Sequence, residues 1–142
     1  MNHSVAQILK QASPGWGAQT GSLGERSAEA FLSRKRGFHV LARNWRNPED
    51  RREEIDLVAR DGEALVFVEV KTRPEAALVP GLYAVDRRKK QVLRRAIRAY
   101  LRRLRGVPRT FRFDVVEVAL TPGEPAIRHF ENIELFSKYF RG

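Results

Sequence analysis

The stretch EIDLVARDGEALVFVEVKTR, residues 54–73, decides the predicted fold of this chain. It holds two strand-like runs, 54–60 and 63–71, on either side of Asp61-Gly62. An Asp-Gly pair between two such runs is a strong signal for a two-residue β-hairpin turn. The stretch is therefore predicted to form two antiparallel strands joined by that pair.

Closure at Asp61-Gly62 would place Arg60 opposite Glu63 and would sort the other side chains onto two faces, because residues alternate along a strand. One face would be apolar and directed to the core. It would carry Ile55, Leu57, Ala59, Val66, Val68 and Val70. The other face would carry Glu54, Asp56, Phe67, Glu69 and Lys71.

Three carboxylates share the second face, and like charges across a strand pair repel. Mg²⁺ or Mn²⁺ would relieve the repulsion between Glu54, Asp56 and Glu69, because hard cations prefer oxygen ligands. Lys71 leaves its strand on the same side as Glu69, where it can orient or activate a water. The open alternative is a solvent-facing surface, on which Lys71 neutralises Glu69 in an ion pair worth about 0–1 kcal/mol.

Length and composition exclude several classes of protein. With 142 residues, 42% of them hydrophobic, we expect a short N-terminal tail, residues 1–21, and one folded domain, residues 22–142. The chain has no cysteine, which excludes disulfide scaffolds, iron–sulfur clusters and thiol nucleophiles. It has neither a long apolar run nor a signal-peptide pattern, so we expect a cytoplasmic protein without a membrane partner.

The charge indicates a polyanionic partner. Twenty-seven basic residues against 17 acidic ones give a formal net charge of +10, and a guanidinium suits phosphate. Nucleic acid is therefore the expected partner. The alternative is that arginines merely fill solvated helix surface.

The remaining patterns predict a mixed α/β domain in the order α-β-β-β-α-β, with a central sheet flanked by helices. The first strand is expected to end before a charged loop at 49–53, and residues 132–140 resemble a docked terminal helix. The elements outside the hairpin are expected at 22–36 (helix), 38–42 (strand), 86–104 (helix), 111–120 (strand) and 126–130 (short strand).

The helix over 86–104 begins with Asp86 as its predicted N-cap and carries a basic arc opposite its apolar stripe. We expect this arc to contact phosphate rather than to be a solvated face. Lys89 falls instead on the apolar side, where it would reach the carboxylates or a bound phosphate, or simply extend to solvent. The arc consists of Arg87, Arg94, Arg95, Arg98 and Arg102.

Two features near the ends of the domain have their own interpretations. Glu25 completes a capping-box pattern with Ser22, and it also lies on the inward side of its predicted helix. Arg112 and Asp114 alternate with apolar residues in the late strand, and a structural ion pair is their expected role.

An aspartate, a hairpin turn and then Glu-x-Lys resemble the PD-(D/E)xK nuclease core. The wider sequence is similar to the YraN family of predicted endonucleases, which share the restriction-endonuclease-like fold. In this chain Glu53 stands where that family usually has glycine. The motifs that carry the resemblance are GERSAEAFL (24–32), ARNWR (42–46), EIDLVARDGEALVFVEVKTR (54–73), Val85-x3-Lys89 and RFDVVEV (112–118).

The resemblance implies roles for five residues. Asp56, Glu69 and the Val70 carbonyl would ligate the metal, and Lys71 would be the catalytic lysine. Glu25 would match the helix-borne glutamate that related Holliday-junction resolvases bring to the same site.

Together these features predict a Mg²⁺- or Mn²⁺-dependent nuclease that hydrolyses DNA phosphodiester bonds, with DNA favoured over RNA and branched DNA or a junction as one substrate type. Such relatives commonly act as homodimers on symmetric DNA, so a homodimer is one expected state of this chain. Two alternatives stay open: a non-catalytic nucleic-acid-binding module on the same fold, and a structural RNA-associated protein.

Overall fold

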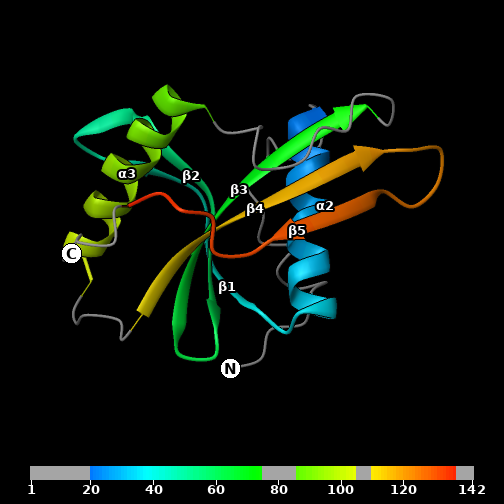
Figure 1. The fold of residues 1–142 in the computed structure, drawn as a ribbon, viewed down its shortest axis with the longest axis horizontal. Helices are drawn as coiled ribbons and strands as arrows, with labels where there is room; N and C mark the ends of the chain where they lie inside the picture. Colours follow the sequence, from blue (N-terminus) through cyan, green and yellow to red (C-terminus); the bar gives the residue numbers. More distant parts are fainter. Residues whose placement is uncertain (1–19, 75–85, 105–109, 137–142) are drawn as a thin grey trace.

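The computed structural model describes residues 20–74, 86–104 and 110–136. Its elements are α2 (Thr20–Lys35), β1 (His39–Asn47), β2 (Asp50–Asp61), β3 (Ala64–Pro74), α3 (Arg87–Arg102), β4 (Thr110–Leu120) and β5 (Ala126–Phe130) (Figure 1). The strands form one sheet in the order β1-β2-β3-β4-β5, antiparallel except for the parallel pair β3 and β4. The predicted mixed α/β class is confirmed, and the architecture fits a restriction-endonuclease-like fold. Residues 1–19 lie outside the described residues, so the N-terminal tail stays a prediction there, whereas Thr20 and Gly21, its last two predicted residues, belong to α2.

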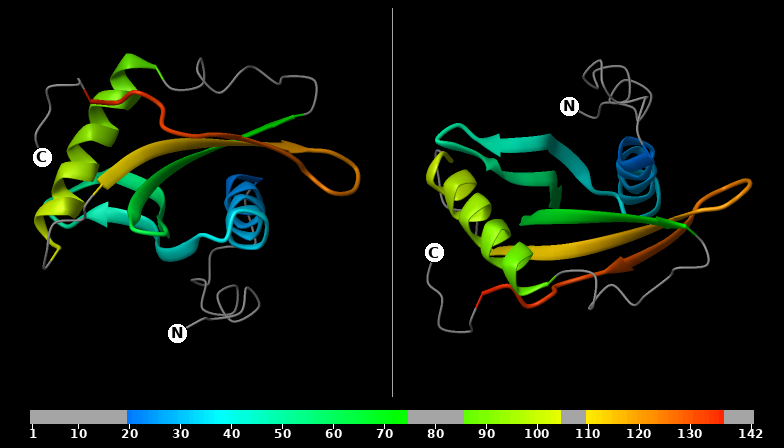
Figure 2. Two further views of the ribbon diagram at one scale, coloured as in Figure 1. Left: turned by 60° about the horizontal axis from the view of Figure 1, so that its bottom comes forward. Right: turned by 90° about the horizontal axis from the view of Figure 1, so that it is seen from above.

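Each face of the sheet is covered by one helix, α2 on one side and α3 on the other (Figure 2). The core beneath α2 includes Ala28, Leu32, Leu57, Ala59, Val66, Val68, Val116 and Val118. The core beneath α3 includes Ile55, Val58, Phe67, Leu93, Ala96, Ile97, Phe113 and Val115. The prediction that the hairpin has one polar face is therefore wrong, because both of its faces contribute buried apolar side chains.

The hairpin itself is confirmed, but its turn lies one residue later than predicted. Asp61 pairs with Ala64, and Arg60 pairs with Leu65 rather than with Glu63. Gly62 is the first turn residue and has φ 58°, which is the glycine position of a type II′ turn. Since an Asp-Gly signal also suits a type I′ turn, composition alone could not fix this register.

The alternation of side chains along β2 breaks at Asp56. Ile55 belongs to the core beneath α3, whereas Leu57 belongs to the core beneath α2, although residues two apart normally share a face. This break explains why the predicted assignment of Ile55 to the same face as Leu57 is wrong. It leaves Asp56 at the irregular point of the strand.

The neighbouring strand breaks at the same level. Arg43 faces α2, Trp45 packs against the core beneath α3, and Asn44 between them has φ 47°. In the β1–β2 register, Asn44 lies across from Asp56. The two irregular residues therefore form one local feature that spans both strands.

An ion pair holds α2 against β1. Glu29 is fully buried, and its two carboxylate oxygens each accept a 2.9 Å hydrogen bond from Nε of Arg43. Burial raises the pKa of Glu29, although the hydrogen bond and charge of Arg43 act in the opposite direction. Because Glu25 lies one helical turn before Glu29, this pair also fixes the part of α2 that carries Glu25.

Several predicted boundaries need correction. β1 continues to Asn47 and β2 begins at Asp50, so the predicted loop at 49–53 is mostly strand in a β1–β2 hairpin. α2 begins at Thr20, so Ser22 lies inside the helix, and the capping-box interpretation is wrong. Residues 131–136 are not helical; the rest of the predicted terminal helix lies outside the described residues. The predicted cap of α3 is confirmed, because Asp86 Oδ1 accepts a 2.8 Å hydrogen bond from the backbone N–H of Lys89.

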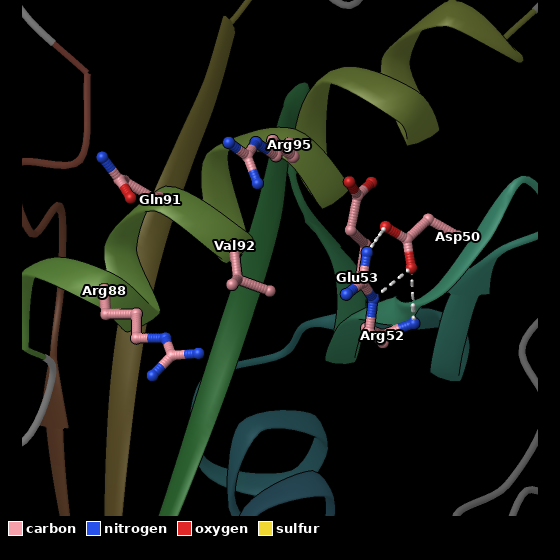
Figure 3. Close-up of a pocket in the computed structure, with 7 residues that line it drawn as sticks. All are labelled: Asp50, Arg52, Glu53, Arg88, Gln91, Val92 and Arg95. Carbon is pink, nitrogen blue, oxygen red and sulfur yellow. Dashed lines mark hydrogen bonds and ion pairs between the residues drawn. The ribbon is translucent and has the colours of Figure 1, made fainter.

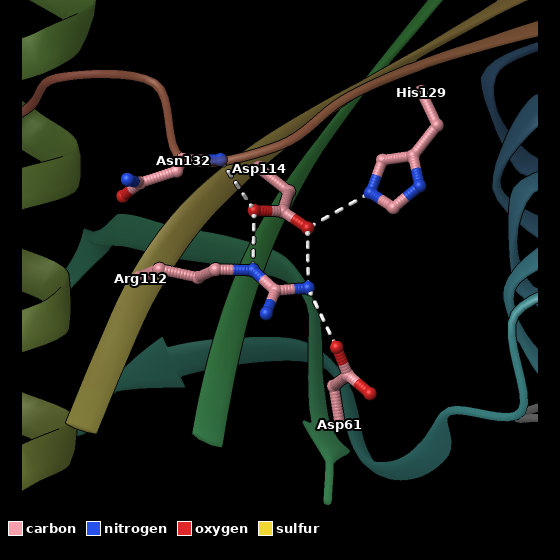
Figure 4. A network of polar contacts seen from close by, with 5 residues as sticks. All are labelled: Asp61, Arg112, Asp114, His129 and Asn132. Atoms are coloured by element: carbon pink, nitrogen blue, oxygen red, sulfur yellow. Dashed lines mark hydrogen bonds and ion pairs between the residues drawn. The ribbon is translucent and has the colours of Figure 1, made fainter.

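A buried carboxylate ties β5 and the segment after it to β4 (Figure 4). Asp114 accepts hydrogen bonds from Arg112 Nε (3.0 Å) and the Asn132 backbone N–H (3.0 Å), and lies 2.8 Å from His129 Nε2. Arg112 also contacts Asp61 at 3.0 Å, so the network reaches the β2–β3 turn. The predicted Arg112–Asp114 ion pair is confirmed, within a larger network.

Within the described ranges, none of the helices is both long and apolar enough to cross a membrane.

Candidate active site

The site lies where β2 and β3 diverge (Figure 1). Their backbone pairing starts at the turn and extends to Leu57 and Val68. Beyond it, the backbone N–H of Val70 donates a 2.8 Å hydrogen bond to Oδ2 of Asp56 instead of to a strand partner. Asp56 therefore closes the end of the ladder and is held beside the residues that follow Val68.

Glu69 is the centre of charge in this site. It is 3% exposed, and its Oε1 lies 3.5 Å from Nζ of Lys71 and 3.5 Å from Nζ of Lys89. Its Oε2 is buried and has no hydrogen-bond partner within residues 20–74, 86–104 and 110–136. The structure thus brings Lys89 to the carboxylates, as predicted, and leaves one oxygen of Glu69 for another ligand.

The acids in the site perturb one another. Burial raises the pKa of Asp56 well above its ordinary value, and the nearby charges of Glu69 and Glu25 raise it further. The hydrogen bond from Val70 and the charge of Lys89 oppose this shift. Strongly perturbed acids that share a charged cluster are typical of functional sites.

Glu25 belongs to the same group of carboxylates. Burial raises its pKa, and the charges of Glu54 and Glu69 act in the same direction, while a hydrogen bond from the Asn44 side chain lowers it. Glu25 from α2 therefore lies within electrostatic range of Glu69 from β3. Glu54 lies at the edge of the group, where it also forms a 3.5 Å ion pair with Arg46.

The donor set fits a hard divalent cation, although only in part. Asp56 and Glu69 supply carboxylate oxygens, and no described residue forms a hydrogen bond with the buried Oε2 of Glu69. Among the residues that the structure describes, no three His, Cys, Asp or Glu side chains are grouped closely enough to hold a metal. Mg²⁺ commonly uses one or two protein carboxylates and keeps several waters, so two carboxylates are compatible with a Mg²⁺ site, and the Val70 carbonyl stays a predicted ligand.

The predicted basic arc of α3 divides into two parts. Arg94 donates a 2.9 Å hydrogen bond to the carbonyl of Leu135, and the guanidinium of Arg98 lies 5.6 Å from the ring of Phe136. These two arginines thus stabilise the C-terminal segment. Arg87, Arg95, Arg98 and Arg102 are exposed, which suits contact with phosphate and a solvated helix face equally, so the phosphate contact stays a prediction.

A groove runs between α3 and the β1–β2 hairpin. One part of it, of about 290 Å³, is lined by Asp50, Arg52, Glu53, Arg88, Gln91, Val92 and Arg95 (Figure 3). The adjoining part is lined by Asn47, Glu49, Asp50, Glu53, Arg95, Arg98 and Arg102. One wall is therefore rich in arginine and the other in carboxylates. Arg88 lines the groove, and Lys89, the next residue of α3, is directed instead to Glu69.

Comparison with known sequences decides the family. Residues 24–118 match the family described as "Uncharacterised protein family UPF0102". The chain belongs to the UPF0102 family. The matched range contains all the carboxylates and lysines of the site.

Relatives within UPF0102 support this assignment over most of the chain. A UPF0102 protein of Nocardia farcinica is 41% identical over 114 residues, 80% of this chain and 87% of that protein. One of Beutenbergia cavernae is 43% identical over 114 residues, 80% of this chain and 93% of that protein. Among solved structures, Pyrococcus furiosus SfsA in complex with Ca²⁺ is 13% identical with a TM-score of 0.31, covering 79% of this chain and 62% of that one.

Sequence reasoning on this UPF0102 chain missed two residues. Arg88 lies seven residues before Arg95 and on the same stripe of α3, a spacing that predicts a shared face. Asn44 forms a hydrogen bond with Glu25, and no spacing rule relates these two residues. Only the packing of α2 against β1 brings them together.

Proposed function

We propose that this protein is a metal-dependent nuclease that hydrolyses phosphodiester bonds in nucleic acid, with DNA favoured over RNA. The observation that carries the proposal is the convergence of Asp56, Glu69 and Lys71 where β2 and β3 diverge. There, Oε2 of Glu69 is buried and has no hydrogen-bond partner among the residues that the structure describes. The resemblance to PD-(D/E)xK nucleases in these same residues supports it.

Asp56 and Glu69 would hold Mg²⁺ or Mn²⁺ together with the Val70 carbonyl. When bound, such an ion polarises a phosphoryl oxygen and lowers the pKa of a bound water. Lys71 lies on the same side of β3 as Glu69, and its ammonium would orient the attacking water and stabilise charge that develops on the phosphate. Glu25 would complete the carboxylate group from α2, and Lys89 would contact a phosphate that enters the site.

The exposed arginines of α3 support a nucleic-acid ligand. Arg88 and Arg95 line one part of the groove, and Arg95 and Arg102 line the adjoining part. We propose that the sugar–phosphate backbone follows this arginine wall towards Glu69. Positively charged side chains along such a path supply affinity without sequence preference.

A cleavage assay tests the proposal. Linear duplex, single-stranded and four-way-junction DNA, and a matched RNA, are incubated with Mn²⁺ under single-turnover conditions. The expected result is cleavage of at least one DNA, lost in Glu69→Gln, reduced roughly a hundredfold or more in Lys71→Ala, and kept in the control Glu131→Gln, which changes an exposed glutamate. Equal cleavage by wild type and Glu69→Gln would refute the site.

One observation favours a second function, a nucleic-acid-binding module that does not cut. Both Lys71 and Lys89 contact Glu69, so ammonium groups already offset part of the charge that a cation would neutralise. A binding module would bind the same DNA with and without Mn²⁺ and would cleave none of it. A dimer on symmetric DNA stays a proposal for either function, and sedimentation with a junction substrate tests it.

A further inference from the structure

Asn44 adopts a backbone conformation that side chains other than glycine rarely accept. Its φ is 47°, and it shares this left-handed region with one other non-glycine residue in the described part of the chain, Asn132 with φ 55°. A left-handed backbone costs an ordinary L-residue about 1–2 kcal/mol, and asparagine tolerates it best. Strain of this kind concentrates at functional sites, where surrounding contacts maintain it.

The location of Asn44 relates it to two acids of the site. In the sheet it lies across from Asp56, at the level where both strands lose their alternation. Its side chain forms a hydrogen bond with Glu25 of α2. One residue thus contacts one acid through its side chain and faces the other across the sheet.

The hydrogen bond between Asn44 and Glu25 affects both the charge and the direction of the Glu25 carboxylate. Glu25 is partly buried near Glu54 and Glu69, and these surroundings favour the neutral carboxyl group. A donor amide favours the charged carboxylate instead and fixes the direction in which it points. Without that donor, the Glu25 carboxylate would lose one contact that fixes its direction relative to the other carboxylates.

We infer that Asn44 is a positioning residue of the candidate active site, which directs the Glu25 carboxylate towards Asp56 and Glu69 while its left-handed backbone maintains the break that presents Asp56. This inference rests on the proposed function, because it assigns Asn44 a role in cation binding. It adds Asn44, on β1, to a site otherwise built from β2, β3 and two helices.

Three variants separate the backbone role from the side-chain role. Asn44→Gly keeps the left-handed backbone but removes the amide, since glycine accepts positive φ freely. Asn44→Ala removes the amide and adds backbone strain. Asn132→Gly is the matched control, because Asn132 has the same backbone region but is exposed and remote from Glu25.

Two measurements are made on each variant: thermal unfolding with and without Mn²⁺, and the carboxyl ¹³C resonance of Glu25 in metal-free protein. Asn44→Gly is expected to melt near the wild type, whereas Asn44→Ala melts about 3–8 °C lower. Both are expected to bind Mn²⁺ about tenfold or more weakly, the loss typical when a supporting hydrogen bond is removed. Both should shift the Glu25 resonance, which Asn132→Gly leaves in place.

The outcomes that overturn the inference are distinct from failure of the proposed function. A Glu25 resonance unmoved in Asn44→Gly would refute the positioning role, whether or not metal binds. Wild-type Mn²⁺ affinity in Asn44→Gly would also refute it, because asparagine would then matter only for the left-handed backbone conformation and not for its side-chain amide. Absence of any Mn²⁺ response in the wild type would instead refute the metal site, and the resonance would still decide the contact.

Discussion

Replacing Gly24 by alanine is expected to destabilise the protein, although the same change usually stabilises a helix. Gly24 lies in α2, directly before Glu25, and is packed against Thr72 of β3. A Cβ atom built on Gly24 would lie 1.7 Å from Oγ1, 2.9 Å from Cβ and 3.2 Å from Cγ2 of Thr72. The first two distances are impossible contacts, so α2 or the Thr72 side chain must move.

The expected magnitude follows from two opposing terms. Alanine in place of glycine within a helix gains about 0.8–1 kcal/mol, and Gly24 has no positive φ that would forbid it. Adding a methyl group to a tightly packed contact costs about 1–3 kcal/mol, and the overlap here is severe enough for the upper part of that range. The net loss in unfolding free energy is therefore expected to be about 1–2 kcal/mol.

Urea unfolding of four proteins measures this effect: wild type, Gly24→Ala, Thr72→Ala and the double variant. Thr72→Ala removes Oγ1 and Cγ2 and leaves only the 2.9 Å contact, so the double variant should recover much of the loss. A coupling energy of at least about 0.5 kcal/mol is expected for residues in direct contact. Stabilisation by Gly24→Ala alone, or strict additivity, would refute the close approach of α2 to β3 and with it the placement of Glu25.

Three further sets of substitutions test what individual charged side chains contribute to stability and to DNA binding. Asp114→Asn should lower the unfolding free energy in urea at pH 7 by about 3–5 kcal/mol, the range for removing one partner of a buried ion pair. Burial raises the pKa of Asp114, but hydrogen bonds from His129 and Arg112 outweigh burial, so the pKa of Asp114 is lowered overall. The difference in stability between the variant and the wild type should therefore shrink as pH falls below about 4, where the wild type loses the stability that the charged carboxylate contributes. For Asp56 the sign is reversed: its pKa is raised by burial and by Glu69, so the folded state binds the proton more tightly and loses stability as pH rises above about 4. Asp56→Asn should therefore stabilise the metal-free protein relative to the wild type by more at pH 7 than at pH 4. An equal gain in stability at both pH values would contradict this expectation. Changing Arg95 and Arg102 to serine should reduce the log–log salt slope of DNA binding by about 0.9 for each phosphate that the protein no longer neutralises, with unfolding unchanged; an unaltered slope would place the DNA elsewhere.

The sequence predicted features that depend on local spacing. The hairpin signal at Asp61-Gly62 and the cap at Asp86 each involve residues within four positions of one another, and both elements are confirmed. The proximity of Lys71 to Glu69 also followed from the period of a strand. The contact of Lys89 with the carboxylates was predicted because the helical period places this charged residue on the apolar side of α3, where a lysine requires an anionic partner.

The features that the sequence did not predict depend on contacts between distant residues. The break in alternation at Asp56 lies at the same level as the left-handed Asn44 on the neighbouring strand, and asparagine adopts that conformation in only some of its positions. The separate role of Arg94 within the basic arc depends on the C-terminal segment, because Arg94 donates a hydrogen bond to the carbonyl of Leu135. Periodicity describes each element separately, so it cannot identify partners that packing supplies.

The two lysines at Glu69 limit how the site can work. Lys71 and Lys89 both lie 3.5 Å from the same oxygen, which is longer than the roughly 2.7–2.9 Å of an optimal charge-assisted hydrogen bond. The opposite oxygen, Oε2, has no hydrogen-bond partner in the described part of the chain, so a cation that binds there need not first displace either lysine. A cation at Oε2 would also weaken the hold of Glu69 on both ammonium groups through repulsion between like charges. Lys71 would then be available to a water and Lys89 to a phosphate, so cation binding and substrate binding should strengthen each other at this one carboxylate.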